Sequence, residues 1–459
     1  MKKATTVKLG VVPVKRGLYF TSLENALVSK QRAFSSLAKI RGNVEIINLD
    51  SVINNGIATS PEQIPTIVKY LKDNEVDAVF MLHCDFGLEE IVARVGKAIG
   101  KPLLLWGARD DAPDSVSGVR IRDTQCGIFA SSKVLQRYGV PFTYIENCYA
   151  DDPMFVQGVE DFCRTAAVVK AFKSMRILEI GNRPRGFLSV MYNEEELLNK
   201  FGIEVVPLSM GSFYRHIKDM VAKPDNRLIE LMNSLRQKMD CSSLGEEKLK
   251  VIAAMIAFIR EEMERNCCNG VAIECWSSTQ DLFGILPCQV IGELTEMGYP
   301  AACEADVAGA VTSVMLQAAD YNKQPSFFAD LTIRHPENDN AELLWHCGPF
   351  PCSLKAADSK PAVDAFGRGQ WRLREGDITV TRFDGVNGKY SLFIGEAKAI
   401  DGPKTQGTYT WMEVEDWSKW ERKFVEGPYI HHVSVMYGKY ARILQEACKY
   451  IPGLCADRI

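Results

Sequence analysis

Residues 300–330 read PAACEADVAGAVTSVMLQAADYNKQPSFFAD, and two carboxylates here stand at the ends of apolar runs with a helix-like segment between them. The run AAC predicts a short strand, and VAGAVTSVMLQAA repeats apolar residues at helical spacing. The run PSFFA then ends at Asp330. Open α/β sheets keep their chemistry at strand ends, so Glu304 and Asp330 are the first candidates for catalysis. The alternative is that both are solvated loop acids.

Length and composition describe an ordinary globular protein. A chain of 459 residues is too long for one core, which predicts two or three domains. Hydrophobic residues make up 46% of it and charged residues 24%. The net charge of −4 and the lack of a basic run argue against nucleic acid as a partner. We find no leader sequence and no apolar stretch of about 18 residues, which predicts a cytoplasmic protein that does not enter a membrane.

The chain contains 14 cysteines, many of them inside apolar runs. This is typical of reduced, packed thiols in a reducing compartment. No C-x-x-C occurs, so the cysteine spacing gives a structural zinc site little support.

Residues 1–170 alternate strand-like runs (VKLGVVPV, VEIINL, VDAVFML, PLLLW) with amphipathic helical ones. Continuous apolar strands in a repeated β-α-β pattern predict a doubly wound parallel sheet, that is, an N-terminal α/β domain. Polar residues follow the strands: Lys15 and Arg16, His83, and Arg109. Arg16 and His83 are predicted to contact a ligand at the switch point, against the alternative that they are loop residues or helix caps.

Residues 171–320 repeat this pattern with the strand-like runs MRILEIG, IEVVPLS and GVAIECW, which alternate with helical runs. The middle domain is therefore also predicted to be a doubly wound (Rossmann-like) parallel sheet. Its GNRPRG turn lacks the glycine pattern of a dinucleotide site.

Residues 321–459 are predicted to form a β-rich, mainly antiparallel C-terminal domain. Short runs such as ITVTRFDG and YSLFIGEAKAI are separated by turn residues, and VNG predicts a hairpin. The chain then returns to a helix, KYARILQEACKYI. Aromatic residues here and at the end of GVAIECW are either core residues or contacts for a sugar ring, and Trp276 and Trp411 are the candidates for the second role.

The motifs exclude several enzyme classes. The chain has no G-x-S-x-G elbow, no P-loop and no H-E-x-x-H helix. What remains are the two carboxylates and the pair His431 and His432 in GPYIHHVSVMYG, out of six histidines in all. Carboxylates with one imidazole suit Mn²⁺, or another divalent ion such as Mg²⁺ or Co²⁺, better than zinc.

Four blocks carry a resemblance to a known family: ACEADVAGAVTSVML, FFADLTIRH, the HCG after ELLW, and HHVSVMYG. They resemble the L-fucose isomerase and L-arabinose isomerase superfamily, and its fucose isomerase branch most. The resemblance implies one manganese ion bound by Glu304, Asp330 and His432. It also implies trimers or hexamers in which a neighbour's N-terminal domain completes the site. His346 is the expected substrate contact or an additional ligand of the ion.

The expected function is thus a metal-dependent conversion of a free, unphosphorylated sugar between aldose and ketose by an enediol mechanism. Glu304 and Asp330 would be both ion ligands and proton carriers. Two alternatives stay open, a sugar-binding or sensing protein without catalysis and a metal-dependent aldolase or hydrolase. The sugar also stays open among a pentose, a 6-deoxyhexose and an anionic derivative.

Overall fold

The computed structural model describes residues 5–17 and 22–459. The chain forms two compact units, Ala4–Lys170 and a second one that comprises Ala171–Ile459, called here the N-terminal and the C-terminal unit. The division into three domains expected from the sequence stays a prediction. In the described part of the chain, no helix has the length and apolar character needed to cross a membrane.

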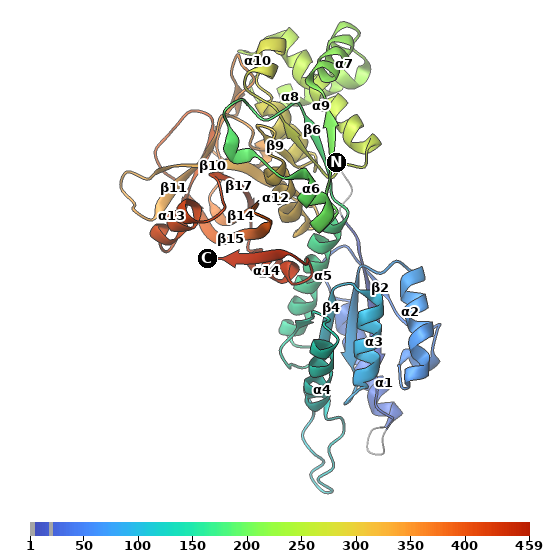
Figure 1. Cartoon of the computed structure of the whole chain (residues 1–459). Coiled ribbons are helices and arrows are strands. Elements are labelled where there is room, and N and C mark those ends of the chain that lie inside the picture. Colours follow the sequence, from blue (N-terminus) through green and yellow to red (C-terminus); the bar gives the residue numbers. More distant parts are fainter. Residues whose placement is uncertain (1–4, 18–21) are drawn as a thin grey trace. The chain divides into compact units, whose positions relative to one another are not determined.

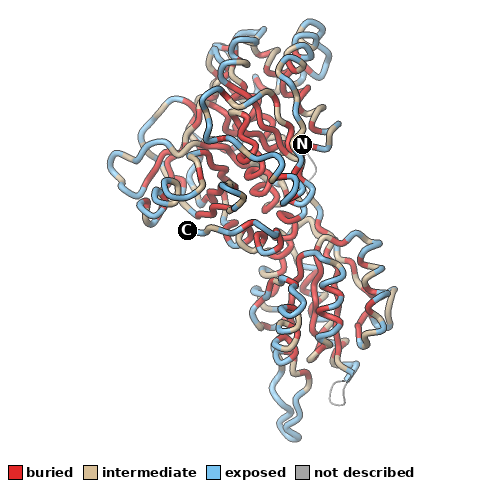
Figure 2. Tube along the Cα trace, viewed as in Figure 1, coloured by how far each residue is buried: buried red, intermediate tan, exposed pale blue. Residues whose placement is uncertain are grey.

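The N-terminal unit is a five-stranded parallel sheet with the strand order β2-β1-β3-β4-β5 (Figure 1). This order places the switch point between β1 and β3. The central strands are continuously apolar because helices cover both faces, and they are buried (Figure 2). The strands are β1 (Val7–Val14), β2 (Val44–Ile47), β3 (Ala78–His83), β4 (Leu103–Gly107) and β5 (Thr143–Tyr144), and the helices are α1 (Leu23–Leu37), α2 (Ile64–Asp73), α3 (Glu89–Ile99), α4 (Thr124–Arg137) and α5 (Pro153–Lys173).

Local signals set the helix ends in this unit. The side chain of Ser22 accepts a hydrogen bond from the N–H of Asn25 and so caps the start of α1. Helix α3 ends at Gly100, whose φ of 62° is a left-handed conformation that glycine adopts without a steric cost.

The C-terminal unit begins with a four-stranded parallel sheet of order β7-β6-β8-β9, which confirms the second doubly wound sheet. Its strands are β6 (Arg176–Ile180), β7 (Glu204–Leu208), β8 (Gly270–Ile273) and β9 (Ala301–Cys303). The accompanying helices are α6 (Glu194–Glu196), α7 (Met210–Ala222), α8 (Asn226–Lys238), α9 (Glu246–Arg265), α10 (Ser278–Phe283), α11 (Cys288–Glu296) and α12 (Val307–Ala318).

The β-rich part that follows is a nine-stranded, mainly antiparallel sheet. An additional pairing between β15 and β16 closes six of its strands into a barrel, in the order β16-β11-β10-β17-β14-β15. The fold class predicted from the sequence is confirmed. The strands are β10 (Phe327–Arg334), β11 (Ala341–His346), β12 (Ala362–Val363), β13 (Gly369–Arg372), β14 (Gly376–Val386), β15 (Lys389–Ile400), β16 (Thr408–Glu413), β17 (His432–Tyr437) and β18 (Leu454–Arg458), and the helices are α13 (Trp417–Glu426) and α14 (Ala441–Cys448).

Helix α12 joins the parallel sheet to the barrel. Every residue of α12 is buried, and most of its side chains are apolar, as expected of a helix that is covered on all sides. Polar contacts fix its position against the barrel, since the hydroxyls of Ser313 and Ser434 lie 2.7 Å apart and Thr312 Oγ1 accepts the N–H of Phe383 at 2.9 Å. The run between Glu304 and Asp330 is therefore a rigid connection between two sheets.

Turn chemistry predicts one barrel hairpin correctly. Asn387 and Gly388 connect β14 to β15 with φ angles of 52° and 73°, and a two-residue type I′ turn requires positive φ at both positions. The end of the chain differs from the prediction, because β18 follows α14 and pairs in parallel with β15. This strand is short and half-exposed, so its sequence LCADR has no clear apolar alternation.

Candidate functional site

Four sequence-predicted residues meet where the parallel sheet adjoins the barrel. Glu304 follows β9, Asp330 lies within β10, His346 ends β11 and His432 begins β17. Strand β10 is the middle one of three neighbours, and Asp330 pairs in register with His432 on one side. On the other side Asp330 pairs with Trp345, the residue before His346. The register thus places His432 directly opposite Asp330, and His346, at the end of β11, lies 4.0 Å from the same carboxylate.

The distances describe a tight cluster of possible ligand atoms. His432 Nε2 lies 2.9 Å from Glu304 Oε2 and 3.5 Å from Asp330 Oδ1, and His346 Nε2 lies 4.0 Å from Asp330 Oδ1. All four of these atoms are buried and lack a well-aligned hydrogen-bond partner among the residues that the structure describes. Buried polar atoms rarely lack a hydrogen-bond partner in folded proteins, so we expect a bound group at this cluster.

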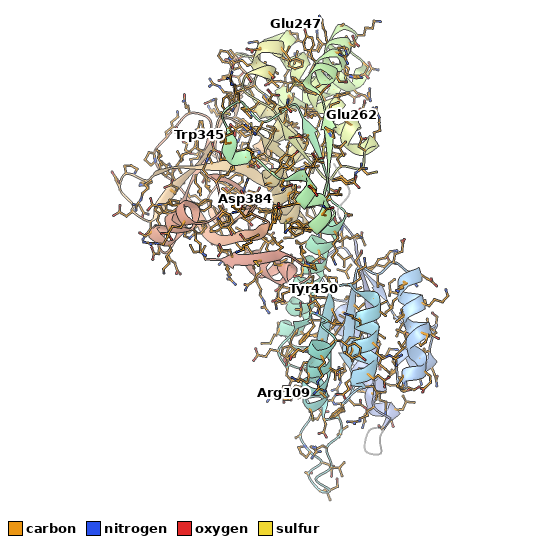
Figure 3. The ribbon with its side chains drawn as sticks, viewed as in Figure 1. Arg109, Glu247, Glu262, Trp345, Asp384 and Tyr450 are labelled. Atoms are coloured by element: carbon orange, nitrogen blue, oxygen red, sulfur yellow. The ribbon has the colours of Figure 1, made fainter. Side chains whose placement is uncertain are left out.

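His432 is oriented by a pair of charged residues that our sequence analysis did not identify. Its Nδ1 lies 2.8 Å from Asp306 Oδ2, and since a carboxylate accepts, Nδ1 carries the proton and Nε2 is directed at the cluster. Asp306 is held in turn by Arg382, through Nη1 to Oδ2 and, at 3.2 Å, Nη2 to Oδ1. Arg382 Nε also donates to Asp384 at 3.0 Å (Asp384 is labelled in Figure 3). A carboxylate behind a histidine is a common arrangement in metal sites.

The charges of these groups follow from their contacts. Burial opposes the charge on His432, but the carboxylates of Asp306 and Glu304 raise its pKa to about 9. Burial alone would raise the pKa of Glu304, yet His432 and His346 hold it below its ordinary value. Asp306 is buried as well, and Arg382 and His432 together lower its pKa. A proton on His432 Nε2 thus occupies the place that a cation would take.

Both histidines face the cluster with Nε2, but they differ in the partner of Nδ1, which is the backbone N–H of Cys347 for His346 and the Asp306 carboxylate for His432. His346 Nδ1 accepts the backbone N–H of Cys347 at 2.9 Å, so a neutral ring carries its proton on Nε2. A cationic ring also has that proton. In either state His346 Nε2 is a hydrogen-bond donor toward the cluster, which suits a contact with a substrate oxygen better than a bond to an ion.

Glu304 is held in an unusual conformation. Both Glu304 and Ala305 have left-handed backbones, with φ of 61° and 51°, which costs energy for residues other than glycine. Trp276 Nε1 donates to Glu304 Oε1 at 3.1 Å, which leaves Oε2 for the cluster. Strain of this kind concentrates at functional sites, where the surrounding structure maintains it.

Aromatic side chains surround the cluster. The ring of Phe187 stacks on His431 at 5.9 Å and meets His432 edge-on at 5.4 Å, and Phe328 meets His432 at 5.0 Å. Phe187 also lies 6.2 Å from Trp276. A cavity of about 860 Å³ lies beside this wall, and its lining includes Asn182, Arg183, Arg185, Gly186, Leu188, Glu274 and Ser277.

The remaining predicted residues lie elsewhere or in the other unit. Trp411 is buried against Leu343 and Tyr409, and its indole N–H donates to the carbonyl of Pro403 at 2.9 Å. Arg16 and His83 belong to the N-terminal unit, where they follow and end β1 and β3 at the switch point. There the N–H of Arg16 donates to Asp85 at 2.9 Å, and its guanidinium lies over the ring of Phe86. Their roles as substrate contacts stay predictions.

The residues fit a hard or borderline divalent ion. Ligand atoms of Asp330, His431 and His432 lie within 4.8 Å of one another, and Glu304 Oε2 adds a second carboxylate at His432. Two carboxylates and an imidazole oriented by Asp306 form a donor set typical of Mn²⁺ or Mg²⁺. His431 is exposed and has no comparable carboxylate behind it among the contacts of the described residues, so His432 is the better ligand.

Comparison with known proteins adds independent information. The family described as "Fucose/sulfoquinovose isomerase, N-terminal domain" matches residues 10–173, and "L-fucose isomerase, C-terminal domain" matches residues 344–453. Together these two matches cover more than half of the chain.

Curated relatives match over nearly the whole length. Sulfoquinovose isomerase from Priestia aryabhattai is 22% identical over 444 residues, which is 95% of this chain and 95% of that protein. Sulfoquinovose isomerases from Alkalicoccus urumqiensis and Clostridium sp. (strain MSTE9) are each 23% identical, over 76% and 66% of this chain and 78% and 68% of their own. Among solved structures, an ABC transporter solute binding protein from Bacillus halodurans C-125 reaches a TM-score of only 0.17 at 12% identity, with coverage of 71% of this chain and 92% of that one, and supports no conclusion.

Proposed function

Since this chain belongs to the fucose isomerase-like family of sugar isomerases, we propose that it interconverts an aldose and a ketose with a divalent ion held by Glu304, Asp330 and His432. The observation that supports the metal site is the convergence of buried oxygen and nitrogen atoms that lack a well-aligned hydrogen-bond partner among the described residues. An ion such as Mn²⁺ would replace the proton that His432 Nε2 otherwise holds. Bound there, it would chelate two adjacent sugar oxygens and stabilise the negative charge of an enediolate.

The reaction moves one proton between C2 and C1 of the sugar and a second between O2 and O1. Glu304 and Asp330 both lie within 3.5 Å of His432 Nε2 and supply oxygens that accept the carbon-bound proton and return it to the neighbouring carbon. The lowered pKa of Glu304 keeps it ionised at neutral pH, as a base must be. The strained backbone of Glu304 and the Trp276 N–H fix the direction of that carboxylate.

Two further groups prepare the site for a sugar. His346 Nε2 donates a hydrogen bond toward a sugar oxygen, since its Nδ1 is already an acceptor for Cys347. The rings of Phe187 and Phe328 keep water away from the histidine and strengthen the charge interactions around it.

The substrate that we propose is an anionic, sulfonated sugar. The name of the relatives supports this, and so does the cavity beside Phe187 and Trp276, because its lining includes two arginines, Arg183 and Arg185. Guanidinium groups suit sulfonate oxygens, while Glu274 and Asn182 suit hydroxyls. The trimer or hexamer in which Arg16 and His83 complete a neighbour's site stays a prediction.

Metal removal tests the proposal directly. Protein treated with a chelator should lose turnover of sulfoquinovose to its ketose, and Mn²⁺ should restore it. Glu304→Gln and Asp330→Asn should each lower kcat about a thousandfold, since each removes a base and weakens the ion. Asp339→Asn, an exposed carboxylate in the same unit, is the matched control and should leave kcat unchanged. Full activity in protein free of metal would contradict the site.

Isotopes test the enediol mechanism. In deuterated water, proton transfer should place solvent deuterium at C1 of the ketose, to the extent that the site lets the transferred proton exchange. A second measurement uses substrate deuterated at C2. It is needed because a carboxylate can deliver the proton from C2 to C1 before it exchanges with solvent, and no solvent deuterium then appears in the product. Complete retention of the substrate's deuterium at C1 at every temperature would favour a hydride shift, and would leave the two carboxylates as ligands only. A sugar-binding protein would give no ketose, and an aldolase would give two fragments.

A further inference from the structure

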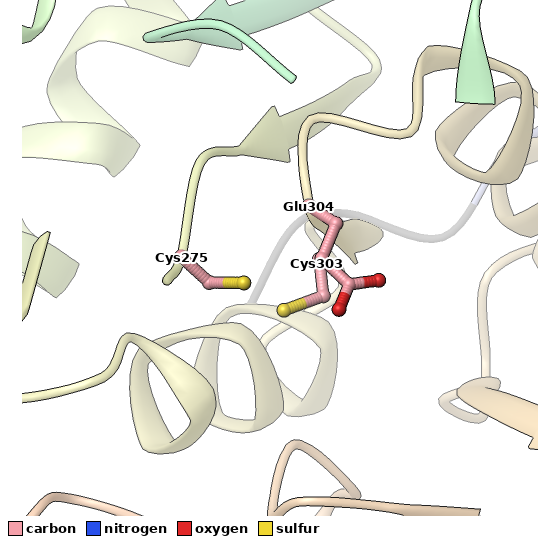
Figure 4. Close-up of side chains that lie close together, drawn as sticks. All are labelled: Cys275, Cys303 and Glu304. Atoms are coloured by element: carbon pink, nitrogen blue, oxygen red, sulfur yellow. The ribbon is translucent and has the colours of Figure 1, made fainter. Parts of the chain in front are cut away.

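Two buried cysteines lie directly behind Glu304. Cys303 ends β9 and Cys275 follows β8, and the two strands are parallel neighbours with Ile273 in register with Cys303. The side chains are 0% and 3% exposed. The two Sγ atoms and a Glu304 oxygen all lie within 4.8 Å of one another. In Figure 4 the thiol of Cys275 is directed at that of Cys303, with the Glu304 carboxylate beside it.

This donor set has a different chemical preference from the ion cluster described above. Thiolates are soft ligands that select ions such as Zn²⁺ and Cd²⁺, whereas Mn²⁺ and Mg²⁺ prefer oxygen. A tetrahedral zinc with bonds of about 2.3 Å to sulfur and about 2.1 Å to oxygen needs ligand atoms roughly 3.5 to 3.8 Å apart. The three ligand atoms lie within 4.8 Å of one another, so no pair has to approach by more than roughly 1.3 Å to reach this geometry.

We propose that Cys275, Cys303 and Glu304 form a second cation site, which takes one thiophilic divalent ion such as Zn²⁺ or Cd²⁺. Glu304 is the ligand that the two sites share, and its side chain is 15% exposed while both thiols are buried. A thiophilic ion at this site therefore withdraws Glu304 from His432 and competes with the hard ion. Such ions inhibit sugar turnover even when Mn²⁺ is present.

The sequence does not indicate this site, because its cysteines are far apart in the chain. Cys275 precedes Trp276 and Cys303 precedes Glu304, so the two cysteines are separated by 28 positions, as Trp276 and Glu304 are. Only the parallel pairing of β8 and β9 brings the thiols together. A second thiol pair lies nearby, since Cys288 Sγ and Cys347 Sγ are 3.2 Å apart. These two thiols contact each other, and Cys347 also contacts the ring of His346. Among the described residues, no carboxylate joins the two thiols in a set of possible metal ligands.

Titration with Cd²⁺ under reducing conditions tests the binding. We expect one tight equivalent, read from the ultraviolet sulfur-to-cadmium charge-transfer band of the full-length protein. Cys275→Ser and Cys303→Ser should each weaken this equivalent at least tenfold, and Glu304→Gln should weaken it while the band persists. Cys163→Ser, a buried thiol of the N-terminal unit, should change nothing. Added Mn²⁺ should lower the apparent Cd²⁺ affinity.

The inhibition arm rests on the proposed isomerase activity, while the binding arm does not. Cys275→Ser should keep its Mn²⁺-supported turnover and lose most of its inhibition by Zn²⁺. If neither cysteine variant changes the tight equivalent, or if Cys288→Ser removes it instead, the proposed site is wrong. Circular dichroism shows whether each variant folds. If Cys303→Ser does not fold, the result with Cys275→Ser decides. If no sugar is turned over, the cadmium titration alone gives the answer.

Discussion

Two buried histidines at strand ends, one in each unit, differ in charge at neutral pH: His83 is neutral and His432 is protonated. His83 ends β3 and His432 begins β17, and they are 1% and 0% exposed. Burial lowers the pKa of His83 to about 4, with only backbone carbonyls such as that of Phe86 opposing it. Burial acts on His432 in the same direction, yet Asp306 and Glu304 raise its pKa to about 9.

The difference shows that neither burial nor position in a strand makes a histidine a ligand. Among the described residues, the buried imidazole of His83 contacts backbone carbonyls and no carboxylate, so burial keeps it neutral. A carboxylate on Nδ1 instead fixes the ring and raises the basicity of Nε2. In this chain Asp306 supplies it, and Arg382 holds Asp306 in place.

The largest effect is expected from a substitution that removes the carboxylate next to His432 Nδ1. Asp306→Asn should lower the affinity for Mn²⁺ by up to about a hundredfold, since the amide orients His432 less well and makes Nε2 less basic. Asp384→Asn is the matched control, because Asp384 also contacts Arg382 but does not contact His432. Competition with a fluorescent chelator measures both affinities. Equal losses in the two variants would assign the effect to Arg382 and not to the hydrogen bond with His432.

His83 allows the opposite test, on stability. Its folded-state pKa of about 4 lies below the ordinary 6.5, so the unfolded chain binds more protons between these values and stability falls as pH falls. From pH 7 to pH 5 the loss should be about 2 kcal/mol for this group. The neighbouring charges, Asp85 and Lys15, lie 3.8 Å apart as a pair of opposite sign.

Hydrogen–deuterium exchange of a peptide that contains β3, corrected for the intrinsic exchange rates, measures this loss of stability at the strand itself. His83→Gln should remove most of the acid-induced loss of protection. The His432 region of the apo protein should show no such loss over the same range, because its raised pKa keeps the ring protonated at both pH values. The same loss in His83→Gln and wild type would mean that another group titrates.

The sequence predicts the fold well where one segment decides it. The apolar strands of the parallel sheets, the helical spacing of apolar residues in α12 and the turn at Asn387 and Gly388 are each predicted from local pattern and confirmed. Closure of the barrel by β15 and β16, and the addition of β18, depend on pairings between distant, short or half-exposed strands. No local period encodes such pairings.

The candidate site shows the same division. Carboxylate and histidine chemistry, with the family resemblance, indicates Glu304, Asp330 and His432. Asp306 stands two residues after Glu304 and has the pattern of a helix cap, which it also is, since it accepts the N–H of Gly309. Its second role depends on Arg382, 76 positions away, and on a strand that begins 126 positions away. Only the tertiary structure reveals that the cap also orients His432, the proposed ligand.

The smallest effect that we predict concerns the outer contact of Glu304. Trp276→Phe keeps an aromatic ring beside Phe187 but removes the N–H that Glu304 Oε1 accepts. A hydrogen bond to a charged group contributes about 1.5 to 3 kcal/mol when buried, and the partial exposure of Trp276 reduces this, so kcat should fall about three- to tenfold. KM should change little, because the ring face is retained. Trp276→Ala should lower kcat by a similar factor and also raise KM if the indole stacks on the sugar. A rise in KM without any fall in kcat in Trp276→Phe would mean that the N–H binds substrate, and that Glu304, unlike His432, needs no neighbour to orient it.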